Sequence, residues 1–101
     1  MPTIFQFDWD EDKARANFNK HAVSFKQGEG VFRDPLALTI YDDEHSEHED
    51  RWITIGMPAT HQYLVVVHTF EENTPGEIHV RIISARRADP HEVNDYQETP
   101  R

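Results

Sequence analysis

The stretch VRIISARR, residues Val80–Arg87, joins branched apolar side chains to three arginines in a chain whose formal net charge is −9. Branched apolar residues are enriched in strands, and the run Ile78–Ala85 is rich in them. Side chains of a strand alternate between its two faces. One face would carry His79, Arg81 and Ile83, and the other Val80, Ile82 and Ser84. The stretch therefore predicts a strand that presents cations in an otherwise acidic protein.

Three further runs resemble this strand in composition: Leu36–Tyr41, Arg51–Met57 and Tyr63–Phe70. Turn-forming residues lie between the runs, and they include Pro58, Asn73, Pro75 and Gly76. Short strands separated by turns are typical of a meander, so we expect the runs to pair as antiparallel neighbours. The alternating segment Thr3–Phe7 predicts a short opening strand.

Cap residues mark the start of three predicted helices. Asp10 can cap a helix that runs to Lys20, and Ser24 can cap a second that ends near Asp34. A third helix follows Asp89, has Pro90 at its first position and Glu92 placed for a capping box, and ends near Gln97. The element order β-α-α-β-β-β-β-α predicts an α+β fold, an antiparallel sheet with helices on one face.

Length and composition indicate one domain over residues 1–101. A chain of this size can bury one core but not two. There is no cysteine, which fits a reducing compartment. The amino terminus lacks the pattern of a signal peptide, and the apolar run Tyr63–Val67 is far shorter than the ~20 residues that cross a bilayer. We therefore expect a cytoplasmic protein without a membrane partner.

The negative charge is unevenly distributed. The acidic loop, Asp42–Asp50 (DDEHSEHED), holds six of the 19 acidic residues, which leaves 13 acidic against 10 basic residues elsewhere. A net charge of −9 argues at first against a nucleic-acid partner, because polyanions attract cations. With the acidic loop set apart, the remaining charge is only −3, and this surface could present a local basic site.

Several cations could gather near one surface of the predicted sheet: Arg81, Arg86, His68 and His79. The functional interpretation is a local basic site on this surface. The alternative is that Arg81 pairs with a carboxylate on a solvated face, where an ion pair contributes little to stability.

The pair Lys20-His21 ends the first predicted helix. A helix carboxyl terminus favours cations, so both residues could serve as caps alone. In the functional interpretation, His21 titrates near neutral pH and moves a proton beside the fixed charge of Lys20.

Two histidines of the acidic loop, His45 and His48, are three residues apart among carboxylates, a set that could bind a divalent metal. The alternative is a solvated loop or a docking surface for a basic partner. Trp9 and Trp52 could stack on a base, although tryptophans beside strands and helices usually belong to the core. Ala14 and Phe18, four residues apart, would face the core.

Five segments in fixed order carry a family resemblance. They are FDWDEDKARANFNKHAVSF (Phe7–Phe25), VFRDPLAL (Val31–Leu38), HSEHEDRWITIG (His45–Gly56), LVVVHT (Leu64–Thr69) and RIISARRA (Arg81–Ala88), followed by Tyr96. The chain resembles the BrnT family of bacterial type II toxins, small ribonucleases with a RelE-like fold encoded beside a BrnA antitoxin. One departure is Ala22, where family members usually have glycine; a positive φ there would strain alanine.

The resemblance implies RNA cleavage without a metal or other cofactor, which inhibits translation. The 2′ oxygen attacks the adjacent phosphorus, so the site needs proton transfer and cations. The implied roles are proton transfer for His21 or His68, phosphate stabilisation for Lys20, Arg51, Arg81 and Arg86, and orientation of Arg51, or service as an alternative base, for Glu49.

The implied partners are an RNA substrate and a BrnA-like ribbon-helix-helix antitoxin. Operator DNA would be contacted only through the antitoxin, and two toxins would be bridged by an antitoxin dimer. Two other functions stay open: a non-catalytic binding module that acts as a co-repressor with the antitoxin, and a metal-dependent hydrolase that uses His45 and His48.

Overall fold

A computed structural model describes residues 3–100. The strands are β1 Ile4–Asp8, β2 Leu38–Tyr41, β3 Trp52–Gly56, β4 Leu64–His68, β5 Glu71–Thr74 and β6 Glu77–Arg87. The helices are α1 Glu11–His21, α2 Phe25–Glu29 and α3 Pro90–Glu98, and single 3₁₀ turns lie at Gly30–Arg33 and Asp43–His45. The α+β fold class predicted from the sequence is confirmed.

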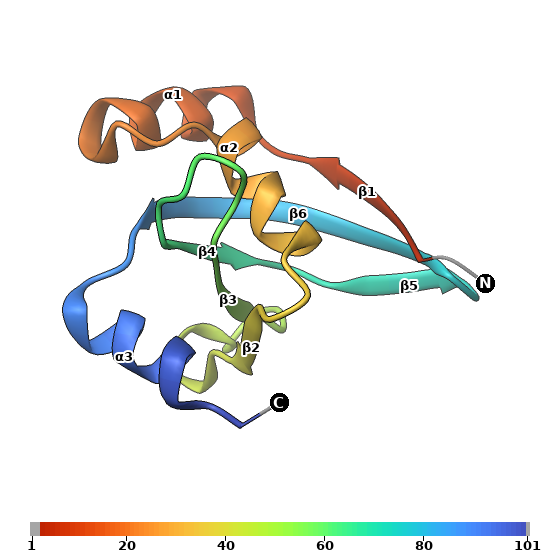
Figure 1. Ribbon diagram of the computed structural model, residues 1–101. Coiled ribbons are helices and arrows are strands. Elements are labelled where there is room, and N and C mark those ends of the chain that lie inside the picture. The colour runs from red at the N-terminus through yellow and green to blue at the C-terminus, as the bar shows by residue number, and fades with distance from the viewer. Residues whose placement is uncertain (1–2, 101) are drawn as a thin grey trace.

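The long strand β6 organises the sheet, whose order is β1-β6-β4-β3-β2 with β5 also paired to β6 (Figure 1). β1 runs parallel to β6, whereas the other pairs are antiparallel. Two expectations are therefore corrected. The sheet is not wholly antiparallel, and the run Tyr63–Phe70 ends as a strand at His68, before a separate strand that the sequence did not predict.

A β-bulge interrupts the pairing of β4 with β6. Val67 pairs with Ser84 and His68 pairs with Ile82, so β6 contains one extra residue, Ile83. Such a bulge shifts the alternation of side chains by one. Arg81 and Arg86 are five residues apart and would lie on opposite faces of a regular strand, yet here they share one face. The expectation that Ser84 faces the same side as Ile82 is wrong for this reason.

The main core lies between the sheet and the helices α1 and α2. Its buried residues are Val23, Phe25, Val31, Leu64, Val66, Ile78, Val80, Ile82 and Ala85. Asn17 of α1 joins helix to sheet, because its amide donates to the carbonyl of Ala85 at 2.7 Å and accepts from the Ala85 N–H at 3.2 Å. Gly28 of α2 lets the helix approach closely, since a Cβ there would lie 3.3 Å from Val66.

The third helix, α3, lies on the opposite face of the sheet (Figure 1). Tyr96 of α3 packs with Ile55 and Val65, whose side chains point away from the main core. Its hydroxyl also donates to Asp34 Oδ2 at 2.6 Å. The expectation that all helices cover one face is therefore wrong. α3 leaves part of this second face of the sheet uncovered, beside β6 and the acidic loop Asp42–Asp50. This uncovered part is called the open face below.

The helix starts follow the predicted capping chemistry. Asp10 accepts hydrogen bonds from the N–H groups of Asp12 and Lys13, and capping boxes begin α2 at Ser24 and α3 at Asp89. The predicted second helix is shorter than expected, because α2 ends at Glu29 and a 3₁₀ turn continues to Arg33.

Only some of the side chains predicted to lie in the core do so. Ala14 and Trp9 pack against the main core, and Trp52 is half-buried. Phe18 is 52% exposed, so its predicted core position is wrong. Across residues 3–100 no helix has the length and apolar character needed to span a membrane.

Candidate functional site

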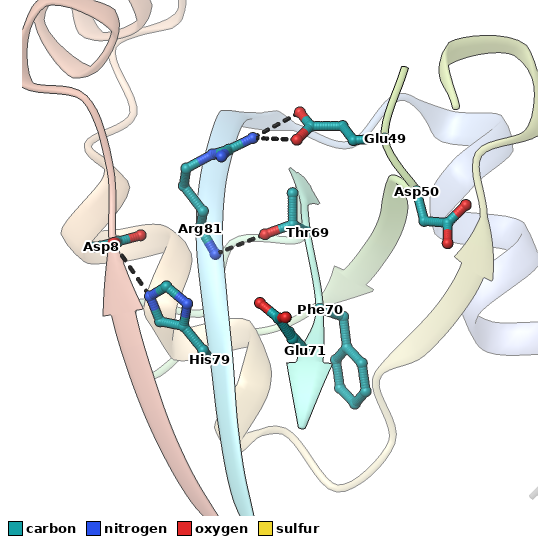
Figure 2. Close-up of a pocket in the computed structure, with 8 residues that line it drawn as sticks. All are labelled: Asp8, Glu49, Asp50, Thr69, Phe70, Glu71, His79 and Arg81. Atoms are coloured by element: carbon teal, nitrogen blue, oxygen red, sulfur yellow. Dashed lines mark hydrogen bonds and ion pairs between the residues drawn. The ribbon is translucent and has the colours of Figure 1, made fainter. Parts of the chain in front are cut away.

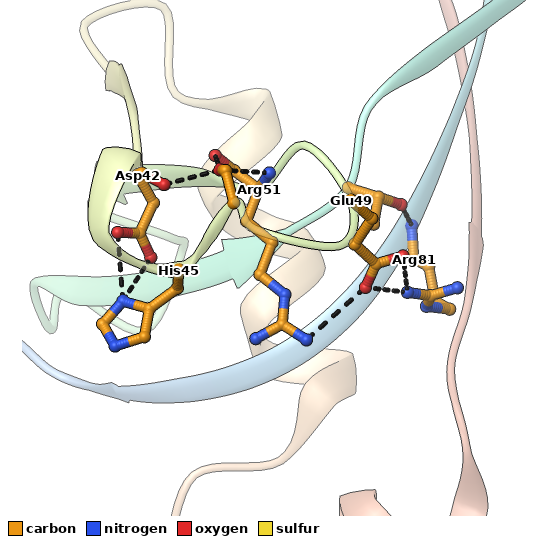
Figure 3. A network of polar contacts seen from close by, with 7 residues as sticks. Asp42, His45, Glu49, Arg51 and Arg81 are labelled. Atoms are coloured by element: carbon orange, nitrogen blue, oxygen red, sulfur yellow. Dashed lines mark hydrogen bonds and ion pairs between the residues drawn. The ribbon is translucent and has the colours of Figure 1, made fainter.

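Glu49 and two arginines form an ion-pair network on the open face (Figure 3). Arg81 of β6 donates from Nη2 to both carboxylate oxygens of Glu49, at 2.6 and 2.7 Å. Arg51, just before β3, approaches the same carboxylate at 3.5 Å. The hydrogen bonds from Arg81 lower the pKa of Glu49, and the charges of both arginines lower this pKa further. Partial burial of the carboxylate acts in the opposite direction and raises it. Three of the predicted site residues are thus together.

The acidic loop that carries Glu49 is folded back on itself. The N–H of Asp42 donates to the carbonyl of Arg51 at 2.9 Å, which closes the base of the loop. Inside it, the hydroxyl of Ser46 donates to the Asp42 carbonyl at 2.5 Å and accepts from the Arg51 N–H at 3.0 Å. Most of the loop carboxylates remain exposed. These bonds hold Glu49 and Arg51 in place over the sheet.

A groove of about 360 Å³ runs beside this network on the open face. It is lined by Asp42, Glu44, His45, Arg51, Ile53, Val67, Ile83, Ser84 and Arg86. The bulge at Ile83 turns Ser84 and Arg86 toward the groove. The sequence analysis interprets His45 as a metal ligand or as part of a solvated loop or docking surface, and it does not predict the position of His45 beside Arg51 and Arg86.

A second hollow, of about 500 Å³, lies on the other side of Arg81 (Figure 2). Its lining residues are Asp8, Glu49, Asp50, Thr69, Phe70, Glu71, His79 and Arg81. His79 pairs with Asp8 at 3.1 Å, and the backbone N–H of Arg81 donates to the hydroxyl of Thr69 at 3.2 Å. The Glu49–Arg81 pair borders this hollow, and Arg51 borders the groove.

Arg86 has a strong partner of its own. It donates to both oxygens of Glu92 at 2.7 Å each, and Glu92 also accepts from the N–H of Asp89 in the capping box of α3. The hydrogen bond to Glu92 raises the pKa of Arg86, and the same bond lowers the pKa of Glu92. Arg86 therefore ties the end of β6 to the start of α3 while it lines the groove.

His68 lies away from this surface. It is fully buried on the helix-covered side, where its ring packs edge-on against Phe32 at a centroid distance of 4.8 Å. Nδ1 faces the carbonyl of Thr69 at 2.9 Å and must donate, so Nε2 accepts from the hydroxyl of Thr54 at 2.7 Å. Burial lowers the pKa of His68. The expected convergence of His68 with Arg81 on one surface is wrong.

Lys20 and His21 are also separate from the open face. They form the last turn of α1, which packs on the opposite side of β6 through Asn17. Lys20 is exposed and His21 half-buried. The sheet therefore lies between this pair and the Glu49 network, and the predicted site divides into two groups.

The guanidinium group of Arg51 has few hydrogen-bond partners. Its Nε is buried and finds no acceptor within residues 3–100. An unpaired buried donor costs about 1–3 kcal/mol. Within the same range, no group of three or more His, Asp or Glu side chains is placed to hold a metal ion. His45 instead faces Asp42.

Comparisons with known proteins agree with this fold. The crystal structure of the ribonuclease toxin BrnT of Brucella abortus matches with a TM-score of 0.60 and 25% sequence identity, over 86% of this chain and 99% of that one. No curated protein sequence matches the chain significantly. A family described as the ribonuclease toxin, BrnT, of type II toxin-antitoxin systems matches residues 9–92.

The fold and the matched residues define the class of protein, a ribonuclease toxin of a type II toxin-antitoxin system. The chain belongs to the BrnT family. Such a system implies an antitoxin partner.

Proposed function

We propose that this protein cleaves RNA without a metal ion, that cleavage inhibits translation, and that a BrnA-like antitoxin neutralises it. The observation that carries the proposal is the placement of Arg51 and Arg81 on either side of Glu49, at the border of two hollows on the open face. Two guanidinium groups offer the donors that a phosphate needs as negative charge develops on it.

The chemistry assigns Glu49 a positioning role. Its lowered pKa makes it a carboxylate at neutral pH and a weak proton acceptor. Because it holds Arg81 with two hydrogen bonds, it fixes the direction of that guanidinium before RNA binds. Arg51 makes only a 3.5 Å contact with Glu49 among the described side chains, so its terminal nitrogens keep donors for a phosphate.

The cations on the helix-covered face are not assigned a direct contact with RNA in this proposal. Lys20 and His21 lie across the sheet from Arg81, and buried His68 donates to a backbone carbonyl. RNA bound on the open face would not reach them directly. Arg86 lines the groove, but both of its terminal nitrogens donate to Glu92, whereas Arg81 uses only Nη2 for Glu49. We therefore place phosphate stabilisation on Arg51 and Arg81.

The test is cleavage of a mixed-sequence RNA by the purified full chain in excess EDTA. We expect Arg81→Ala and Arg51→Ala each to lower kcat/KM about 100-fold, the usual effect of removing one donor to a developing oxyanion. The melting temperature should fall by no more than about 4–8 °C, because partly exposed ion pairs such as these contribute at most about 1 kcal/mol. A gel assay of labelled RNA measures the rate.

Two variants serve as controls for this experiment. Arg87→Ala removes an exposed arginine of the same strand that faces away from Arg86 and should leave cleavage unchanged. His68→Gln should also retain cleavage. Full activity in the Arg81→Ala and Arg51→Ala variants would move the site elsewhere, and wild-type protein that binds antitoxin but cuts no RNA would favour the co-repressor function.

The same proposal includes the assembly with the antitoxin. Two toxins bridged by an antitoxin dimer would leave operator DNA in contact with the antitoxin alone. The exposed carboxylates of the acidic loop support this, because a DNA-binding partner is expected to be basic and complementary to them.

A further inference from the structure

We infer that His45 is the residue that accepts the proton in RNA cleavage and that Asp42 positions it. This inference rests on the proposed function, and it concerns neither of the histidines that the sequence favoured. His45 ends the 3₁₀ turn Asp43–His45, and its side chain is 63% exposed. Asp42 is buried, with only 8% of its surface exposed.

The contact between the two residues fixes the imidazole. Nδ1 of His45 lies 3.1 and 3.0 Å from the two carboxylate oxygens of Asp42. An ionised carboxylate only accepts hydrogen bonds, so Nδ1 carries the hydrogen and donates it. In the neutral ring the other nitrogen, Nε2, is then left as an acceptor. Figure 3 shows Nε2 turned away from Asp42.

Asp42 itself is held firmly. At the base of the acidic loop, its N–H donates to the carbonyl of Arg51, and its carbonyl accepts from the hydroxyl of Ser46. A carboxylate anchored through its backbone can fix the ring beside it, as second carboxylates do in catalytic dyads. Exposed His48, three residues further on, makes no such bond within residues 3–100.

The position of His45 matches the needs of the reaction. His45 and Arg51 line the same groove, together with Ser84 and Arg86. A proton acceptor and a cation therefore border one hollow. Lys20, His21 and His68 do not line it.

The step balances with water as the only other reactant. Nε2 takes the proton of the ribose 2′ hydroxyl as the 2′ oxygen attacks the adjacent phosphorus. The bond from phosphorus to the 5′ oxygen breaks, and that oxygen takes a proton from water. The proton on Nε2 then returns to solvent. The products are a 2′,3′-cyclic phosphate and a 5′ hydroxyl, and the guanidinium of Arg51 faces the charge that develops on the phosphate.

The test is steady-state cleavage of RNA by full-length variants with added imidazole. His45→Ala should lower kcat at least about 100-fold, the lower end of the usual contribution of general acid–base catalysis. Free imidazole should restore activity to this variant, a result that a purely structural role of His45 does not produce. His45→Gln keeps an amide for Asp42 but has no proton acceptor of this kind, so it should be folded and inactive.

The positioning role of Asp42 is tested by measuring how Asp42→Asn changes kcat and KM separately. Asp42→Asn should lower kcat about tenfold while KM stays within threefold, because the ring loses its orientation and not its substrate contacts. In the double variant Asp42→Asn/His45→Ala the loss should equal that of His45→Ala alone, since Asp42 acts through His45. His48→Ala is the matched control and should behave as wild type.

The outcomes separate this inference from the proposed function. If wild type cuts RNA and a folded His45→Gln variant cuts equally well, His45 is not the proton acceptor and the proposed function stands. Loss of activity in His45→Ala that imidazole does not restore, together with a raised KM, would also overturn the inference. If wild type cuts no RNA while it binds its antitoxin, both proposals fail.

Discussion

Ala22 ends α1 in a left-handed conformation, with φ 57° and ψ 28°. Its N–H donates to the carbonyl of Phe18 at 2.8 Å, which closes the last turn of the helix. A side chain in this conformation costs about 1–2 kcal/mol, and glycine avoids most of that cost. The strain suspected from the sequence at this position is therefore confirmed.

Ala22→Gly should raise the free energy of unfolding by about 1 kcal/mol, because the relief of backbone strain exceeds the added entropy of the unfolded chain. Urea denaturation followed by circular dichroism measures the change. The matched control is Ala16→Gly, an exposed position inside the same helix, which should lower the same free energy by about 1 kcal/mol. A destabilised Ala22→Gly variant would contradict the account.

For single residues, the sequence predicted only some of the side chains that lie together in the structure. It named Glu49, Arg51 and Arg81, but the partner of Arg81 lies 32 residues away in the chain and spacing alone does not reveal it. The burial of His68 can be predicted from the sequence, since His68 alternates in step with Leu64 and Val66, which are core residues. The spacing of Asp42 and His45, three residues apart, was a signal for the contact that forms between them.

Among the elements, β6 decides where the cations lie. The bulge at Ile83 brings Arg81 and Arg86 to one face, and nothing in the alternation of Val80–Arg87 predicts an extra residue there. β5 was missed for a related reason. Its sequence, Glu71–Thr74, is polar and fully exposed, so it becomes a strand through pairing with β6 and not through its own composition.

The junction of β6 with α3 yields a second prediction. Glu92→Gln should lower the free energy of unfolding by roughly 1 kcal/mol near pH 7, a value reduced for solvent screening because Arg86 is 38% exposed. The pKa of Glu92 is lowered in the folded state from an ordinary value of 4.5. The contribution should therefore be complete above pH 4.5 and disappear as the pH falls through the lower, folded value.

Urea titrations of wild type and Glu92→Gln between pH 3 and pH 7 test this dependence. Glu98→Gln, an exposed change in the last turn of the same helix, is the control and should cost almost nothing. A Glu92→Gln difference that is as large at pH 3 as at pH 7 would show that the ion pair with Arg86 is not its source.

The whole molecule has two unlike faces. Helices α1 and α2 cover one side of the sheet, and α3 covers only part of the other, beside the open face (Figure 1). The sequence predicted the α+β class and most elements, because caps and strand runs are local signals. It did not predict the side chosen by α3, since that choice depends on Tyr96 reaching Asp34 across 62 residues.

The charge of the molecule is arranged in the same uneven way. The acidic loop borders the groove that holds Arg51, so under the proposed function an RNA would reach a few cations past many carboxylates. Long-range attraction to RNA should consequently be weak, and binding should depend on local contacts to a small number of phosphates.

The central claim, that RNA binds on the open face, is tested most directly by backbone amide chemical shifts of the ¹⁵N-labelled protein. The ligand is an RNA oligonucleotide with methylated 2′ hydroxyls, which cannot be cut. The account predicts that the largest changes fall at Arg51, Arg81 and Ser84, and that Arg81→Ala reduces them. Changes confined to Lys20, His21 and the surrounding surface of α1 would contradict it.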